Sequence, residues 1–410
     1  MGKITKLWYS YDFANSFASS VLVFYYPLIL AEKGVGSAWI GIPASISTII
    51  LLIILPRLGN YSDAKEKKMF FIRIASILML VSLAVIAFLS QHSEIFSLNI
   101  LFLLSVCYIL FQVCFQGSFG FYSAMLRNIS NPENSAKISG IGIALGQLGN
   151  VLSLGIIGII LGSSFVFLGL SGKPLAFLLG GLLFVGISLP FLLQKESPTK
   201  QVNQSFSYKA LLKKVFSDKK RYLFIVGYSL LADSILTFQI YITVYLKDIF
   251  NFSDQLIAYA GITGLVSTVI GGFVIQAIVT KIKDKEKTYI FSAIFYSFCF
   301  FLYAVIPEIT WVAFVCLAFS GFAYAMVFSL ARSIYSEISP ENEQAGFFSI
   351  FTIFERAASV VGPLVWLAAF YVLEKFGKNM QYRGAVLVLA ITCLVGFYFL
   401  KKSSKFKAIS

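Results

Sequence analysis

Twelve long apolar stretches divide this sequence, and they constrain the fold more than any other feature. A helix needs about 20 predominantly apolar residues to cross a bilayer, and every stretch reaches that length. Only 13% of the 410 residues are charged, about half the share in an average soluble domain. The chain is therefore predicted to be an all-α membrane protein with twelve transmembrane helices, at residues 7–31, 38–59, 69–90, 98–126, 137–162, 174–194, 221–247, 254–281, 288–307, 309–333, 344–373 and 382–401.

The longest polar segment, residues 195–220, separates the sixth span from the seventh. It predicts an N-terminal six-helix bundle over 1–194, a cytoplasmic linker over 195–220 and a C-terminal six-helix bundle over 221–410.

The two predicted bundles resemble each other at a nearly constant offset in sequence. Two parallel six-helix repeats of this kind are the architecture of the major facilitator fold, which is the fold class predicted here. The matching segments are 13–17 with 231–235, 65–67 with 285–287, and 131–134 with 339–342.

The net charge is +14, with 33 Lys and Arg against 19 Asp and Glu, and such a balance on its own suggests a nucleic-acid partner. With both termini on one side of the membrane, that side holds about 26 of the 33 basic residues. Basic residues concentrate in cytoplasmic loops, so both termini are predicted to be cytoplasmic. The protein is expected in a plasma membrane or a bacterial inner membrane. Topology thus explains the charge, and no nucleic-acid partner is expected.

The loop between the second and third spans carries a short signature. Residues 59–68 read Gly-Asn-Tyr-Ser-Asp-Ala-Lys-Glu-Lys-Lys and resemble the major facilitator pattern G-x-x-x-D-x-x-G-[RK]-[RK]. In that superfamily the segment is a cytoplasmic latch, so the resemblance implies a latch of Gly59, Asp63, Lys67 and Lys68. Asp63 would sit at a positive helix N-terminus, and the basic pair would face the cytoplasm. The alternative interpretation is a solvated basic loop.

Two departures from the latch pattern carry expectations of their own. Glu66 replaces the second Gly of the pattern, so a different turn is expected. In the copy after the eighth span, Lys283 stands opposite Asp63, and a weaker latch is expected there.

The first span opens with a polar stripe inside an apolar segment. Asp12 and Asn15 are three residues apart and share one helical face, and Ser16 and Ser19 continue it. Charged and amide side chains in a span are costly unless they face protein or water, so the stripe is predicted to line an internal cavity. The alternative is that Asp12 caps the start of the helix at the membrane interface.

Several segments resemble the vacuolar amino-acid effluxer-like branch of the major facilitator superfamily, which includes autophagy-related effluxers of yeast. Residues 11–16 read Y-D-F-A-N-S like its opening signature, and 139–149 resemble its helix 5 pattern, with Gln147 at a frequent Tyr position. Asp233 and Thr237 stand where its helix 7 carries Asp and Thr. Residues 331–333 and 346–363 resemble its helix 10–11 region. The resemblance implies a small-solute transporter, with amino-acid export as the best-known role.

Three charged residues lie deep in predicted spans: Asp233 in the seventh span, and Glu355 and Arg356 in the eleventh. A charge at the bilayer centre costs about 2.5–3.5 kcal/mol even on the gentler insertion scale, so none is expected to face lipid. Arg356 is predicted to pair with a carboxylate, Asp233 or Glu355, across neighbouring helices. The resemblance makes Arg356 the retained cation and Glu355 a departure. The alternative is an internal salt bridge that only fixes packing.

Further polar residues are spaced like the lining of a cavity. The repeat sets Gln147 opposite Glu355 and Asn15 opposite Asp233, so each second-half carboxylate has an amide as its counterpart. The remaining candidates for substrate binding or coupling are Gln112 and Gln116, Asn150, and Gln239 and Tyr241.

Together these features predict a secondary active transporter that moves a small polar solute, an amino acid or related zwitterion, by alternating access, with export favoured and proton coupling open. Two alternatives remain: a transporter or flippase of an amphipathic or lipidic solute, and a non-transporting sensor on the same scaffold. No catalytic motif or P-loop is found. No enzyme activity, cofactor or metal is expected, and the chain is expected to be a monomer in the lipid bilayer.

Overall fold

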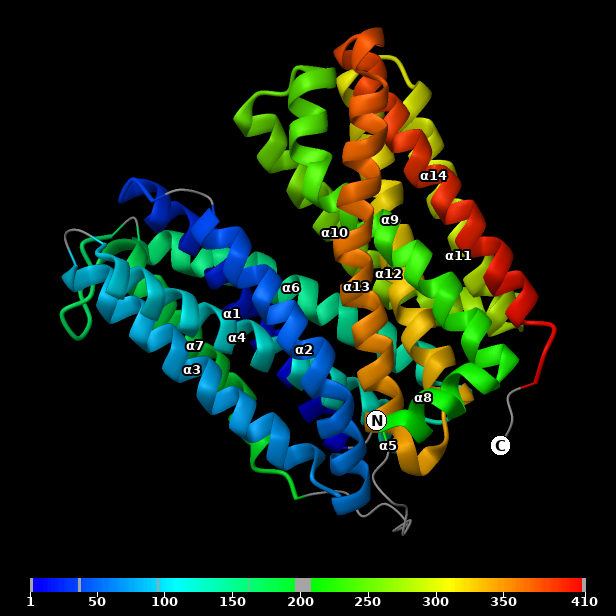
Figure 1. Cartoon of the computed structure of the whole chain (residues 1–410), viewed down its shortest axis with the longest axis horizontal. Coiled ribbons are helices and arrows are strands. Elements are labelled where there is room, and N and C mark those ends of the chain that lie inside the picture. The colour runs from blue at the N-terminus through cyan, green and yellow to red at the C-terminus, as the bar shows by residue number, and fades with distance from the viewer. Residues whose placement is uncertain (1–2, 36–37, 94–95, 162, 196–207, 408–410) are drawn as a thin grey trace. The chain divides into compact units, whose positions relative to one another are not determined.

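A computed structural model of the chain describes residues 3–35, 38–93, 96–161, 163–195 and 208–407. Nearly all of these residues are helical (Figure 1). Within them, twelve helices are long and apolar enough to cross a membrane, which confirms the predicted fold class.

The helices in chain order are α1 (Lys3–Glu32), α2 (Ala38–Lys65), α3 (Lys68–His92), α4 (Leu98–Ala124), α5 (Leu126–Ile129), α6 (Ser135–Leu161), α7 (Gly172–Leu192), α8 (Tyr208–Ser217), α9 (Lys219–Phe250), α10 (Asp254–Ile282), α11 (Lys285–Val305), α12 (Thr310–Ile338), α13 (Gln344–Val372) and α14 (Lys378–Ser403), with 3-10 turns at Glu341–Glu343 and Glu374–Phe376.

The chain forms two compact units. The first comprises Met1–Ile129, Leu145–Tyr208 and Asn342–Ile350, and the second comprises Ser130–Ala144, Lys209–Glu341 and Phe351–Ser410. Two helices, α6 and α13, therefore belong in part to each unit, because the first turns of each group with one unit and the remainder with the other.

Inside each unit the helices pair in the same pattern. In the first unit α1 packs on α7, α2 on α4, and α3 on both α4 and α7. In the second, α9 packs on α14, α10 on α12, and α11 on both α12 and α14. The correspondence is element for element, as a duplicated six-helix unit requires.

The predicted linker over 195–220 is partly helical. Residues 196–207 lie outside the described part of the chain, but Tyr208–Ser217 form α8 and α9 begins at Lys219. Asp218 separates the two helices and caps α9, since its carboxylate accepts a hydrogen bond from the Arg221 N–H at 3.0 Å.

The turn between α2 and α3 has the left-handed backbone conformation that glycine usually adopts. Glu66 adopts a left-handed backbone conformation, with φ of 53°, and the Lys67 N–H donates to the Ser62 carbonyl at 3.0 Å. This six-to-one bond closes a Schellman turn, in which glycine is the usual residue at the left-handed position. The expectation of a different turn was therefore wrong, and Glu66 takes the strained conformation itself.

Candidate functional site

In the first unit, a buried carboxylate links α1 to α4. Asp12 is 8% exposed and lies in the third turn of α1. Its Oδ2 accepts a hydrogen bond from the Tyr122 hydroxyl at 3.1 Å. The Trp8 indole stacks on the Tyr122 ring with centroids 4.1 Å apart, and its Nε1 donates to the Tyr122 carbonyl at 3.0 Å. Aromatic packing thus fixes the hydroxyl that holds the carboxylate.

The same face of α1 lies against α6. Ser16 Oγ donates to the Gly146 carbonyl at 2.7 Å, and a Cβ at Gly146 would lie 3.2 Å from Asp12 Oδ1. A Cβ at Gly149 would come within 2.4 Å of the Phe13 carbonyl oxygen. The glycines of α6 therefore let its backbone approach the polar stripe of α1 closely.

Amide side chains extend this contact by one further turn. Ser20 Oγ donates to Asn150 Oδ1 at 2.7 Å, and Asn150 Nδ2 donates to Gln147 Oε1 at 3.2 Å. Asn15 is buried, and its Oδ1 has no hydrogen-bond partner within the described residues. Of the residues predicted in the first half, Gln147 and Asn150 contact each other, and Asp12 lies against α6 at Gly146.

The two glutamines of α4 are half-buried. Gln112 Nε2 donates to the Tyr108 hydroxyl, one turn earlier, at 3.1 Å. Gln116 Oε1 is inaccessible and accepts no hydrogen bond from the described residues.

In the second unit, a carboxylate and a hydroxyl on α9 face a glycine on α13. Asp233 is 5% exposed and Thr237 is fully buried. A Cβ built on Gly362 would lie 1.9 Å from Thr237 Oγ1 and 2.7 Å from Asp233 Oδ1. Neither oxygen has a hydrogen-bond partner within the described part of the chain. Polar atoms buried in this way are rare, and each calls for an explanation.

On α13, Arg356 pairs with Glu355, which is one of the two carboxylates predicted for it, but not across neighbouring helices as predicted. Arg356 Nη2 donates to Glu355 Oε1 at 2.8 Å, so the salt bridge joins adjacent residues of one helix and not neighbouring helices. The long arginine side chain spans the angle between the two helical directions. The other carboxylate oxygen of Glu355 accepts a hydrogen bond from the Tyr228 hydroxyl of α9. Phe351 stacks on the Tyr228 ring at 4.2 Å.

The last two predicted residues lie farther along α9. Gln239 is exposed. Tyr241 is half-buried and stacks on Trp366 of α13, with centroids 4.7 Å apart and an interplanar angle of 3°.

In the first unit, three of the four predicted latch residues, Gly59, Asp63 and Lys68, lie at the start of α13. Asp63 Oδ1 accepts a hydrogen bond from the Ala345 N–H at 3.0 Å, and its Oδ2 accepts one from the Gly346 N–H at 2.7 Å. These groups belong to the first turn of α13, where N–H groups lack partners in their own helix and the dipole favours an anion. Asp63 therefore caps α13.

The neighbours of Asp63 complete this contact. Lys68 Nζ lies 3.1 Å from Asp63 Oδ1, and both side chains are 4% exposed, so Lys68 turns inward and only Lys67 is exposed, contrary to the expectation that both face the cytoplasm. A Cβ at Gly59 would lie 2.0 Å from Ser349 Oγ and 2.6 Å from the Ala345 carbonyl oxygen. Gly59 thereby lets α2 approach the first turns of α13.

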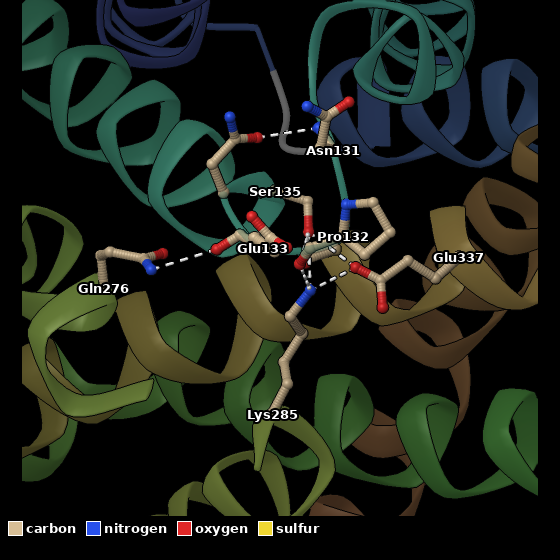
Figure 2. Close-up of polar contacts among 9 residues, drawn as sticks. Asn131, Pro132, Glu133, Ser135, Gln276, Lys285 and Glu337 are labelled. Carbon is tan, nitrogen blue, oxygen red and sulfur yellow. Dashed lines mark hydrogen bonds and ion pairs between the residues drawn. The ribbon is translucent and has the colours of Figure 1, made fainter. Parts of the chain in front are cut away.

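In the second unit, an ionic network surrounds the start of α6 (Figure 2). Lys285 Nζ donates to the Pro132 carbonyl and to Ser135 Oγ, each at 2.7 Å, and to Glu337 of α12. Ser135 Oγ donates to Glu337 Oε1 at 2.7 Å and contacts Ser333 Oγ at 2.7 Å. A weaker contact was expected here because Lys283 stands at the position that corresponds to Asp63 in the repeat, so no carboxylate was expected. The carboxylate comes instead from Glu337.

A buried arginine on α12 extends this network into α6. Arg332 is 3% exposed, and its Nε donates to Ser139 Oγ at 3.1 Å. Both residues belong to segments singled out in the sequence, the one at 331–333 and the one that opens at Ser139. The structure gives these two segments a physical connection.

The Lys285–Glu337 contact predicts a measurable coupling. Lys285→Met should destabilise the protein by about 1–2 kcal/mol, because the ion pair is mostly shielded, with side-chain exposures of 12% and 26%. The loss should be smaller when Glu337→Gln is already present. Thermal unfolding in detergent measures both. Lys287→Met is the matched control, since Lys287 is 76% exposed; an equal loss there would contradict the prediction.

The sequence is similar to a protein family model and to individual relatives. A family model described as Major Facilitator Superfamily matches residues 9–363 and, in a second match, 267–408. The MFS-type transporter YxiO of Bacillus subtilis is 24% identical over 96% of this chain and 93% of its own. Autophagy-related protein 22 of Saccharomyces cerevisiae is 25% identical over 40% of this chain and 31% of its own. These matches confirm the resemblance inferred from the sequence segments.

A solved structure is also similar in fold. A bacterial homologue of the iron transporter ferroportin, in an outward-facing state, matches with a TM-score of 0.78. The match covers 99% of this chain and 100% of that one at 16% identity, so it bears on the fold alone.

Proposed function

This chain belongs to the major facilitator superfamily, and from that premise we propose that it is a secondary active transporter of a small polar solute, an amino acid or related zwitterion. The observation that carries the proposal is the presence, in each unit, of a buried carboxylate on the first helix of the repeat facing a glycine on the fifth. In the first unit these are Asp12 and Gly146, and in the second Asp233 and Gly362. Buried ionisable groups in spanning helices mark substrate and ion pathways.

The side chains around these carboxylates suit a solute that carries one positive and one negative group. Glu355 and Arg356 offer an anion and a cation next to each other, and Arg356 is half-buried, so its guanidinium is partly accessible. Gln147 and Asn150 supply neutral donors and acceptors in the first unit. A zwitterion needs both a cation and an anion as partners, and a neutral sugar does not.

The two carboxylates of the second unit differ in their surroundings, which separates their proposed roles. Glu355 is engaged by Arg356 and by the Tyr228 hydroxyl. Asp233 Oδ1 has no hydrogen-bond partner within the described residues, and burying a polar atom without a hydrogen bond is costly. Asp233 is therefore the better candidate for coupling to protons, and Glu355 for an ion pair that orders the substrate site.

The proposed orientation and location follow the charge bias of the loops. Both termini lie in the cytoplasm, and the membrane is a plasma or bacterial inner membrane. Alternating access moves the two repeats around the substrate. The Asp63 cap of α13 and the Lys285–Glu337 network act as cytoplasmic latches for one of the access states.

Counterflow in proteoliposomes tests the transport proposal. Vesicles preloaded with an unlabelled amino acid should take up the labelled form faster than protein-free vesicles. The assay needs no assumption about the direction of transport or the coupling ion. If no amino acid, peptide or sugar gives counterflow, the small-solute proposal fails.

Asp233→Asn tests the coupling assignment. The variant should lose solute accumulation driven by a pH gradient, down to about the equilibrium level, while counterflow persists, because the asparagine cannot bind and release a proton. Glu355→Gln should keep its dependence on the gradient. The reverse pattern would move the coupling role to Glu355, and an unchanged gradient dependence in both variants would exclude both residues.

A further inference from the structure

The amphipathic helix α8 presents a row of lysines to its surroundings. Leu211 is 4% exposed and Val215 is fully buried, and together they form the inner face of the helix in the second unit. Lys209, Lys213 and Lys214 are exposed on the outer face. The helix is thus anchored by packing, and its charged face is held in a fixed orientation.

The length of α9 is compatible with α8 lying at the depth of lipid headgroups. With 32 residues and about 1.5 Å of rise per residue, α9 is roughly 48 Å long, whereas a hydrocarbon core is about 30 Å thick. One or both ends of α9 must therefore reach the headgroup layer, and α8 adjoins its first residue. Phe216 and Tyr222 flank this junction and are 40% and 41% exposed. Aromatic side chains favour this interfacial depth.

The end of α14 adds further lysines beside the start of α9. Ser403 Oγ donates to the Lys220 carbonyl at 2.8 Å, and Lys219 Nζ lies 4.4 Å from the centroid of the Phe406 ring. The two chain segments 208–222 and 398–407 therefore meet. Their exposed lysines are Lys209, Lys213, Lys214, Lys219, Lys401, Lys402, Lys405 and Lys407, and we refer to these eight residues as the basic surface.

The charge on these two segments is strongly one-sided. They contain one acidic residue, Asp218, which is 2% exposed and is held by the Arg221 N–H and guanidinium. Topology alone requires basic residues in the loops, but it requires neither an ordered amphipathic helix nor aromatic residues beside them. The combination is typical of a site for anionic lipid.

We propose that the basic surface binds the headgroups of anionic phospholipids in the surrounding membrane. The lysine ammonium groups pair with lipid phosphates, and Phe216 and Tyr222 reach the acyl boundary next to them. A soluble phosphate would use only the charges, whereas a phospholipid uses the charges and the aromatic side chains together. The site is separate from the transport residues and does not depend on the proposed substrate.

Hydrogen exchange of α8 tests this site in the full-length protein. The wild type is reconstituted in phosphatidylcholine vesicles with and without phosphatidylglycerol, and exchange is followed in peptides that cover Tyr208–Ser217. Phosphatidylglycerol should slow exchange roughly tenfold or more, since several lysines contribute together. Inorganic phosphate added to pure phosphatidylcholine vesicles should leave exchange unchanged.

A pair of triple variants separates this site from general charge attraction. Lys209→Gln, Lys213→Gln and Lys214→Gln together should abolish the response to phosphatidylglycerol. These substitutions leave the Leu211 and Val215 packing intact, which an unchanged melting temperature in detergent verifies. The control carries Lys281→Gln, Lys283→Gln and Lys287→Gln, which remove three exposed lysines around the junction of α10 and α11 in the same unit. It should respond like the wild type.

Three outcomes would overturn the proposal. The first is identical exchange of α8 in the two kinds of vesicle. The second is a response that survives the α8 triple variant. The third is equal loss in both triple variants, which would show that only total charge matters.

Discussion

Asp63→Ala is expected to destabilise the protein by about 3–5 kcal/mol, the range found when one partner of a buried ion pair is removed. The substitution removes the carboxylate that pairs with Lys68 at 3.1 Å. It also removes the acceptor of two N–H groups in the first turn of α13. Thermal unfolding in detergent should therefore show a clear fall in melting temperature.

Two further variants show whether the charge pair or the helix cap is responsible. Lys67→Ala removes the adjacent exposed lysine and should change the melting temperature little. Adding Lys68→Met to Asp63→Ala should recover part of the loss, because the buried ammonium is then gone. The cap remains lost, so recovery should be incomplete. A full-sized loss in Lys67→Ala, or no recovery in the double variant, would contradict this account.

Gly362→Ala is expected to cost about 3 kcal/mol, at the upper end for overpacking a well-packed site, and to abolish counterflow. The added methyl would stand 1.9 Å from Thr237 Oγ1 and 2.7 Å from Asp233 Oδ1, which no relaxation of a few tenths of an ångström can accommodate. Melting temperature and counterflow in proteoliposomes measure the two effects.

A second-site change tests whether the methyl clash is the cause. Thr237→Ala removes the nearer of the two oxygens, so the double variant with Gly362→Ala should regain part of the stability. Gly261→Ala is the matched control in the same unit, because a Cβ there meets nothing within 4 Å. A comparable loss in Gly261→Ala would point to a general intolerance of alanine in these helices.

The twelve spans could be predicted because the bilayer imposes one strong requirement, a long apolar helix, at each crossing. The helix pairing inside each unit could be anticipated from the repeat. Helix α8 was missed, since three lysines within ten residues lower its mean hydropathy and hide the buried pair Leu211 and Val215. Amphipathic spacing was the signal that could have revealed it.

The polar contacts were predicted less well, because they depend on which side chains meet in space. Asp63 could be singled out from its local pattern, but its partners at Ala345 and Gly346 are far away in the sequence. Glu337 was missed for the same reason: the repeat pointed to Lys283, and the carboxylate came from another helix. Tyr122 and Tyr228, which bind the two carboxylates Asp12 and Glu355, had no signal beyond being two of many aromatic residues.

Glu66 shows how a departure from a pattern can leave the structure unchanged. The replacement of a glycine suggested another turn, yet the backbone is left-handed there. The reason is that Lys67 N–H and Ser62 carbonyl close the turn, so the surrounding helices determine the local conformation.

The division of α6 between the two units has a consequence for how the chain is made. Ser135 and its partner Glu337 are separated by 202 residues, and Ser139 and Arg332 by 193. A ribosome synthesises the chain from its N-terminus, so α6 enters the membrane long before α12 exists. The first turns of α6 therefore cannot form these contacts until α12 has been synthesised, and the packing of α6 is completed only late in translation.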